Sequence, residues 1–474
     1  QTVLSKFFGK SRACLGPRPF VPAEKGANAM SQSKNILGTM PMGRLIFTMS
    51  GPIMLSMLMQ AVYNLVDSIY VARLGDNAFL ALSYAYPIQT LLIAFCVGTG
   101  VAFSATLSQR LGARQMDQAS AVVLHGGSFY FGCWLLFFLF GLLGADAYLR
   151  ACTDTPSVIT QGAAYLRVCC CLSFGVCTQF PCERILQSSG RPAGFMIIQG
   201  SGALINIILD PILIFVFDMG VVGAAVATVI GQITGAFIGL FLVHSLREHF
   251  PITLRGQRLQ PALLGEMGRI AGPAILMQSL SSVMSLGLNA ILRRVSETAV
   301  WVLGVYFKLQ SFVFMPIFSV NNGLISIISF NYGARDRRRV SGAIRFGMIL
   351  AVGTGVIGCV LLILCATPLL RVCFNAGEQA LALGVPALGL TALSFPVAAV
   401  SIILSAAFQS LGHSRDSLVI SLLRYIVLLL PIALLLVHLW PERAFLCFLL
   451  TELGACLVAL PMYRSVYQSK IAVL

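Results

Sequence analysis

Twelve stretches of this chain are long and apolar enough to cross a lipid bilayer as helices, and this feature restricts the fold more than any other. A helix needs about 20 predominantly apolar residues to span the hydrocarbon core. Unpaired backbone groups are costly in lipid, so only helices and closed barrels span it. We therefore expect an all-α polytopic membrane protein. The expected spans are residues 44–71, 78–107, 121–146, 158–182, 193–217, 221–245, 266–292, 299–330, 341–366, 379–409, 416–438 and 443–465.

The composition indicates the same class. The chain is 57% hydrophobic and 10% charged, whereas soluble domains are about 25% charged. The net charge of +15 does not indicate nucleic-acid binding, because the basic residues lie in short loops rather than in a basic domain. The 14 Cys lack metal-ligand spacing, so we interpret them as small buried hydrophobic residues. No metal cluster or nucleophile motif indicates an enzyme, and no cofactor is expected.

The loop charges predict the orientation. Lys and Arg concentrate in the loops of one side, as in cytoplasmic loops of multi-pass proteins, so we expect both termini in the cytoplasm and the protein in the cell membrane. Residues 1–43 start polar and basic and lack the apolar core of about 7–15 residues that a signal peptide requires. We expect a disordered cytoplasmic leader there, with Met30 as a plausible start.

The two halves of the chain repeat each other. Two motifs recur 221 residues later and a third recurs 222 residues later. These pairs are Gly51-Pro52 with Gly272-Pro273, Gly112-Ala113-Arg114 with Gly333-Ala334-Arg335, and Gln187-Ser188-Ser189-Gly190 with Gln409-Ser410-Leu411-Gly412. Six spans per copy is an even number, so both copies share one orientation and are related by an axis along the membrane normal.

This repeat predicts two six-helix lobes related by pseudo-two-fold symmetry around a central cleft. We expect an N-terminal lobe over residues 44–245 and a C-terminal lobe over residues 266–465. A polar cytoplasmic linker over residues 246–265 joins them, and residues 466–474 form a cytoplasmic tail.

The first span carries polar residues where lipid-facing positions should be apolar. Gln60, Tyr63, Asn64 and Asp67 are spaced at i, i+3, i+4 and i+7, which places them on one helix face. A charge near the bilayer centre costs roughly 2.5–3.5 kcal/mol on insertion scales, so an intramembrane acid indicates a functional site. We expect this face to line a cavity.

A second acid, Asp210, lies in the fifth span, and Asn206 shares its helix face four residues earlier. Pro211 has no N–H and disturbs the preceding turn, which leaves a carbonyl group free beside the acid. At 1.5 Å per residue, Asp67, Asp210 and Thr228 all fall in the outer half of the bilayer. They could converge on one site within the first lobe.

Two carboxylates in a low-dielectric pocket repel each other when both are ionised, so the pair should bind a proton or require a cation. Hard cations prefer oxygen ligands, which Asp67, Asn206, Asp210 and Thr228 supply. These residues are compatible with either H⁺ or Na⁺. The second lobe has Leu288 where the repeat aligns Asp67, so ion chemistry is expected in the first lobe.

Other polar residues inside the expected spans have two possible roles. A helically spaced line on the seventh span includes Gln278 and Ser282 and faces either the cleft or a neighbouring helix. The basic residues that lie inside the expected spans and well away from their ends are Arg167, Lys308 and Arg424.

Several motifs, taken in order, resemble those of the multidrug and toxic compound extrusion (MATE) family. They are Gly51-Pro52 with Asp67, Asn206-x-x-x-Asp210-Pro211, Gly220-x-x-Gly223 with Thr228, and Asn331-Tyr332-Gly333-Ala334-Arg335 with Lys308. The resemblance covers nearly all of residues 44–465, and the acids are placed as in the prokaryotic branch with its ion site in the N-terminal lobe.

The resemblance implies a twelve-helix antiporter that exports amphipathic, often cationic, drugs while H⁺ or Na⁺ enters. It places proton or Na⁺ coupling at Asp67, Asn206, Asp210 and Thr228. The expected substrate-binding residues are Gln60, Tyr63, Asn64, Gln278 and Ser282. The segment Asn321-Asn322-Gly323 departs from the family pattern, which bears on the second lobe's share of the substrate site.

We hypothesise that ion uptake bends the first span at Gly51 and Pro52, with Pro211 as a further hinge, and thereby collapses the substrate site. Only a preference of the ion for one conformation can drive such a change. The expected partners are small amphipathic substrates and membrane lipid, with no nucleic acid, and the expected functional unit is a monomer.

Two alternatives remain. A lipid-linked oligosaccharide flippase can share the two-lobe plan, but it would need several basic residues in the cleft for pyrophosphate. A membrane receptor or channel is less favoured, because the chain has no symmetric pore motif, and an internal repeat with Asp67 and Asp210 in one lobe suits alternating access better.

Overall fold

The structure, a computed structural model, describes residues 36–72, 74, 76–246, 256–374 and 377–474. The first lobe follows the apolar segments expected from the sequence. Its helices are α3 (Met42–Ala72), α4 (Asp76–Gly112), α5 (Met116–Leu143), α6 (Ala145–Cys152), α7 (Pro156–Cys171), α8 (Phe174–Ser188), α9 (Pro192–Pro211), the π-helical turn η1 (Ile212–Val216) and α10 (Gly220–Ser245).

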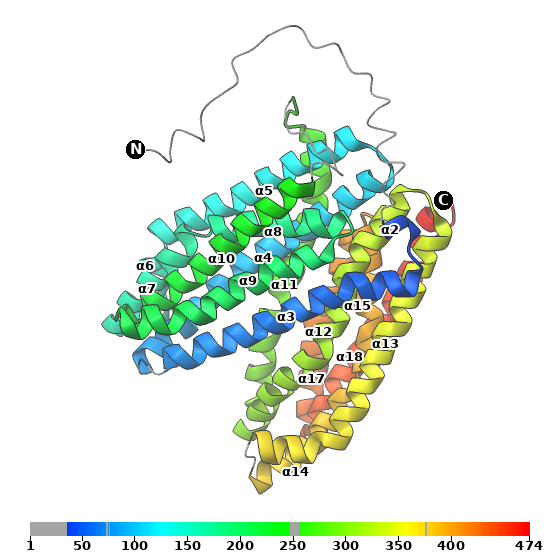
Figure 1. The fold of residues 1–474 in the computed structure, drawn as a ribbon. Helices are drawn as coiled ribbons and strands as arrows, with labels where there is room; N and C mark the ends of the chain where they lie inside the picture. Colours follow the sequence, from blue (N-terminus) through cyan, green and yellow to red (C-terminus); the bar gives the residue numbers. More distant parts are fainter. Residues whose placement is uncertain (1–35, 73, 75, 247–255, 375–376) are drawn as a thin grey trace, which may run out of the picture. The chain divides into compact units, whose positions relative to one another are not determined.

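The second lobe repeats this series. Its elements are α11 (Pro261–Leu292), α12 (Glu297–Gly333), α13 (Arg337–Pro368), η3 (Leu369–Cys373), α14 (Glu378–Ala392), α15 (Phe395–Ser410), α16 (Ser414–Leu422), η4 (Leu423–Val427), α17 (Leu429–Leu439), η5 (Pro441–Leu446), α18 (Cys447–Val466) and η6 (Tyr467–Ile471). Helices α5 to α10 lie together in Figure 1, and α12 to α18 form the second group.

The described residues contain 10 helices that could each cross a membrane, or up to 12 spans if each bent pair counts as one. The first bent pair is α7 with α8, at 43°, and the second is α14 with α15, at 42°. These pairs occupy the fourth and tenth spans, which are equivalent positions in the predicted repeat. The twelve-span, two-lobe fold is therefore confirmed.

The repeated motifs adopt matching backbone conformations. Arg114 and Arg335 are both left-handed, with φ of 58° and 56°. Gly190 and Gly412 also match, with φ of 78° and 79°. Few non-glycine residues adopt positive φ, so its recurrence at the predicted offset supports a shared backbone in the two copies.

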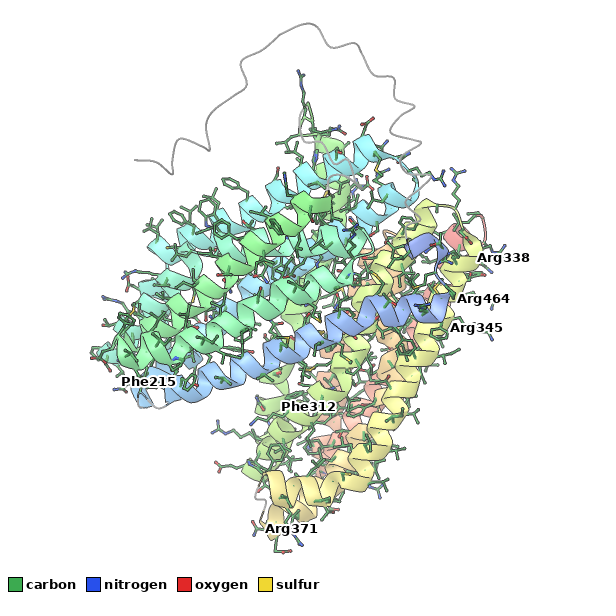
Figure 2. The ribbon with its side chains drawn as sticks, viewed as in Figure 1. Phe215, Phe312, Arg338, Arg345, Arg371 and Arg464 are labelled. Atoms are coloured by element: carbon green, nitrogen blue, oxygen red, sulfur yellow. The ribbon has the colours of Figure 1, made fainter. Side chains whose placement is uncertain are left out.

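Two helix pairs join the lobes across the pseudo-two-fold axis. Helix α3 packs on α12, and the equivalent pair is α11 on α4; α4 and α12 also pack on each other. We name one end of the molecule the closed end (residues 109–115 and 330–336) and the other the open end (residues 71–72, 76–77 and 292–297). Figure 2 labels Arg338, Arg345 and Arg464 near the closed end and Arg371 at the open end of the second lobe.

The ordered structure extends into segments expected to be irregular. Residues 1–35 of the expected leader lie outside the described part, but Ile36–Thr39 form the short helix α2, whose Leu37 is fully buried. Asn331 Nδ2 and an Arg339 guanidinium N–H donate to the Leu37 carbonyl oxygen at 3.0 and 2.9 Å. Helix α11 begins inside the expected linker, and η6 lies inside the expected tail.

Candidate functional site

Four of the predicted ion-site residues come from three helices of the first lobe. Asn206 and Asp210 lie on α9, Thr228 lies on α10 and Asp67 lies on α3. The Asn206 amide donates to Asp210 Oδ1 and to Thr228 Oγ1, each at 3.3 Å. The charges of Asp67 and Asp210 also interact. We call these four residues the acid cluster.

The acid cluster is buried. Asp210 is 0% exposed, Asn206 3% and Asp67 9%. Within the described part of the chain, Asp67 Oδ1, Asn206 Oδ1 and Asp210 Oδ2 find no hydrogen-bond partner. A buried polar atom without a partner is costly. A bound proton or cation would satisfy these oxygens.

The local sequence explains why α9 and α10 approach so closely. A Cβ atom added at Gly231 would lie 2.6 Å from the Gly202 carbonyl oxygen, so only glycine fits this crossing. The crossing lies next to Asn206 and brings Thr228 within reach of its amide. Pro211 ends the regular helix, and the π-helical turn η1 follows directly. Such turns are frequent at functional sites.

A small cavity of about 450 Å³, open solvent included, adjoins the acid cluster; we call it the first-lobe cavity. Its walls include Gln60, Tyr63, Asn206 and Thr228. Tyr63 is hydrogen-bonded to Gln60 and interacts electrostatically with both carboxylates of the acid cluster. The side chain of Asn64 lies outside the described residues, so its predicted role stays a prediction.

A larger cavity of about 1220 Å³, open solvent included, lies between the lobes; we call it the central cavity. Gln60 belongs to its wall from the first lobe and Gln278 from the second. Gln60, Ile93, Phe180 and Gln199 line both cavities, so the two spaces are neighbours that share part of their walls.

Ser282 is separated from both cavities. Its side chain is exposed, and the residue belongs to neither wall. The helical spacing put Gln278 and Ser282 on one face of α11, but the central cavity reaches only as far as the first of them.

The predicted hinge lies where α3 passes from one lobe to the other. Before the hinge, a Cβ atom on Gly323 of α12 would be 2.8 Å from Ser50 Oγ. After it, Met59 contacts Gly200 of α9, and Tyr70 stacks edge-on against Phe215. Gly51 has no atom within 4 Å of an added Cβ, so this crossing point is loosely packed. Helix α3 itself is continuous through Pro52.

The sequence missed Arg184 as an intramembrane residue. The fourth span was expected to end at residue 182, but α8 continues to Ser188. Arg184 is only 5% exposed and lies in the wall of the central cavity. The adjacent Glu183 is fully buried and accepts hydrogen bonds from Gln179 and Gln199. The signal in the sequence that could have identified Arg184 is the adjacent pair Glu183-Arg184 at the end of an apolar segment.

Two other residues noted in the sequence have structural partners. Arg424 forms three hydrogen bonds of 2.8 to 3.0 Å with the Glu452 carboxylate. Lys308 is exposed, and its Nζ lies 6.0 Å from the centre of the Phe374 ring. Among the described residues, no group of three or more His, Cys, Asp or Glu side chains could hold a metal ion.

The protein has two membrane-embedded lobes, a cavity between them and a buried acid cluster. Together, these features define a membrane transporter. The MatE family profile matches residues 52–212 and again residues 273–435, and the second match begins 221 residues after the first. These matches cover well over half of the chain, which therefore belongs to the MatE family of multidrug and toxic compound extrusion transporters.

Curated relatives span most of the chain. The multidrug export protein MepA of Staphylococcus saprophyticus is 25% identical over 385 residues, covering 80% of this chain and 84% of the relative. MepA of Staphylococcus aureus strain MRSA252 is 23% identical over 395 residues, covering 82% and 86%.

Solved structures have the same fold. An outward-facing multidrug resistance MATE transporter superposes with a TM-score of 0.87 at 24% identity, over 93% of this chain and 99% of that one. A MATE structure in the straight conformation also gives 0.87, at 23% identity, over 94% and 100%. At this identity the likeness establishes the fold.

Proposed function

We propose that this protein is an ion-coupled antiporter that exports amphipathic drugs from the cell, with both termini in the cytoplasm. The observation that carries the proposal is the acid cluster. Its buried oxygens without partners lie beside a cavity that shares wall residues with the space between the lobes. The names of the MepA relatives support multidrug export.

In the proposed cycle, H⁺ or Na⁺ enters from the open end and binds at Asp67 and Asp210. Neutralising a buried pair of carboxylates removes their repulsion and the cost of keeping charge out of water. The ion therefore favours the conformation in which the pair is most enclosed, and this difference in affinity is what shifts the equilibrium.

Helix α3 provides the mechanical connection in this proposal. It carries Asp67 on its second half, which packs on the first lobe, while its first half packs on the second lobe. Bending at Gly51 and Pro52 would move Gln60 and Tyr63 in the wall of the first-lobe cavity. A substrate bound there would be expelled toward the open end.

Cationic drugs are attracted to the first-lobe cavity in this proposal, because the carboxylates of Asp67 and Asp210 attract positive charge before the ion binds. Tyr63 and Phe180 in the cavity wall supply aromatic faces, which bind organic cations favourably. The ion and the drug then compete for the same negative charge, which is the requirement for exchange.

The test replaces each acid by its neutral isostere. Asp67→Asn and Asp210→Asn should each abolish export of a cationic dye from proteoliposomes under an imposed proton or sodium gradient. The gradient that drives wild-type export identifies the coupling ion. Asp218→Asn is the matched control, since Asp218 is exposed and adopts a left-handed φ of 53° that asparagine tolerates well. Wild-type export by either cluster variant, at equal protein level, would refute the coupling role.

A further inference from the structure

Arg184 lies in the wall of the central cavity without an acidic partner. Its guanidinium donates one hydrogen bond, from Nη1 to Gln187 Oε1 at 2.9 Å. Nε is buried and has no partner in the part of the chain that the structure describes. The rings of Phe180 and Phe195 lie 6.0 and 5.7 Å from the guanidinium carbon. A buried cation is thus held in place with donor capacity unused.

No carboxylate among the described residues is paired directly with the Arg184 guanidinium. Glu183 attracts it electrostatically, but that carboxylate is hydrogen-bonded to Gln179 and Gln199. The described walls of the central cavity contain no Asp or Glu.

Arg424 offers an instructive contrast in the same cavity. It is 6% exposed, and the carboxylate of Glu452 occupies both its Nε and one Nη. Its charge is therefore paired directly within the protein, whereas the guanidinium of Arg184 has no carboxylate bound to it.

The remaining wall suits an amphipathic ligand. Amide groups of Gln60, Gln199 and Gln278 can donate hydrogen bonds, while Met277 and Phe318 offer apolar surface. A guanidinium matches a carboxylate or a related oxyanion because its N–H groups form a planar fork.

We propose that Arg184 forms an anion subsite in the central cavity, so that the transporter also accepts amphipathic molecules that carry a carboxylate group. This rests on the proposed drug export. Because the central and first-lobe cavities share wall residues, a zwitterionic amphiphile in the central cavity can place its anionic group at Arg184 and direct its cationic group toward the side on which the acid cluster lies.

Two dyes with one scaffold test the anion subsite. Rhodamine 110 has a free carboxylate, and rhodamine 123 is its methyl ester. Binding of each dye to the purified full chain in lipid nanodiscs is measured by fluorescence polarisation. Arg184→Gln should raise the Kd for rhodamine 110 about tenfold or more, the loss expected for one charge-assisted hydrogen bond, and leave that for rhodamine 123 unchanged. Arg184→Lys should recover part of the affinity.

Two further variants distinguish an anion subsite from a structural role. Gln187 donates from Nε2 to the Asn322 carbonyl oxygen across the lobes at 2.7 Å, so Arg184→Gln could act by loosening this contact. Gln187→Leu removes the contact and keeps the charge, and it should preserve the preference of the wild type for rhodamine 110. Arg191→Gln removes an exposed charge seven residues further on and should change neither affinity.

Three results would overturn the subsite: rhodamine 110 binding that does not depend on Arg184, an equal loss of both dyes in Arg184→Gln, or no binding of rhodamine 110 by the wild type. The binding assay needs no gradient. A wild-type protein that binds rhodamine 123 but cannot export it under any gradient would refute the proposed antiport and leave the anion subsite intact.

Discussion

Some buried ionic side chains in this protein are bound to a partner of opposite charge, and others are not. We call the first kind compensated and the second kind uncompensated. Arg424 and Glu452 are compensated, with side chains 5% and 13% exposed and a two-pronged set of hydrogen bonds. The acid cluster and Arg184 are uncompensated: they have no counter-charge bound to them, and Asp67 Oδ1, Asn206 Oδ1, Asp210 Oδ2 and Arg184 Nε lack hydrogen-bond partners among the described residues. We expect stability to depend on the first kind and transport on the second.

The compensated pair predicts an asymmetric response to mutation. Arg424→Gln leaves the Glu452 carboxylate buried without its partner and should destabilise the protein by about 3–5 kcal/mol. The double variant Arg424→Met with Glu452→Met leaves no charge behind and should be closer to wild type. Thermal unfolding of the purified protein in detergent measures both changes.

Arg443→Gln is the control for that comparison, because Arg443 is exposed and should contribute little. If the double variant proved as unstable as the single one, the cost would come from lost packing rather than from an orphaned charge.

Sequence alone identified the acid cluster, because an acid within an apolar run is conspicuous and helix geometry relates positions 206 and 210. The sequence could not identify Arg184 as a buried residue, because the length of an apolar segment indicates where contact with lipid ends and not where the helix ends. Helix α8 continues beyond the apolar run, since its last turns are buried by protein rather than by lipid.

Helices α4 and α12 meet in a reciprocal contact at the closed end. A Cβ atom on Gly112 would collide with the carbonyl oxygen of Phe330, and one on Gly333 would collide with that of Gln109. Residues 109 and 330 are 221 positions apart, as are 112 and 333, so the two contacts are images of each other in the repeat. The sequence predicted the equivalence of these positions but not that the equivalent glycines lie on facing helices.

This reciprocity predicts equal effects from two distant substitutions. Gly112→Ala and Gly333→Ala should each force the helix backbones apart and destabilise the protein by about 1–3 kcal/mol, as overpacking does. The change in unfolding free energy of each variant measures this. Gly342→Ala on α13 has no neighbouring atom within 4 Å of its Cβ and should be neutral or mildly stabilising. A large difference between Gly112→Ala and Gly333→Ala would contradict the equivalence.

At the scale of the whole molecule, three contacts between the lobes fall in the half that includes the closed end. They join Gly112 to Phe330, Gln187 to Asn322 and Gly98 to Ile275. In Figure 2, Phe215 and Arg371 lie at the ends of the two lobes away from these contacts, well apart in the view. The contacts therefore hold the lobes together at the closed end. In the proposed export cycle, these contacts break and re-form.

One ion pair across the lobes is suited to control this equilibrium. Arg110 of α4 donates to the Glu266 carboxylate of α11 at 2.8 and 3.1 Å, with side chains 24% and 42% exposed. A partly exposed pair is worth about 0–1 kcal/mol. Arg110→Glu replaces this attraction by repulsion and should shift the population ratio a few-fold away from the closed-end contacts.

The readout is the distance between spin labels at Val216 and Val372, which are 76% and 79% exposed near the open ends of different lobes. In a cysteine-depleted background, Arg110→Glu should increase the fraction of short distances, because loss of the closed-end contacts lets the open ends approach. The swapped pair Arg110→Glu with Glu266→Arg should restore the wild-type distribution. If the swapped pair fails to reverse the shift, Arg110 acts through packing within α4 and not through Glu266. If Arg110→Glu leaves the distance distribution unchanged, this ion pair does not control opening.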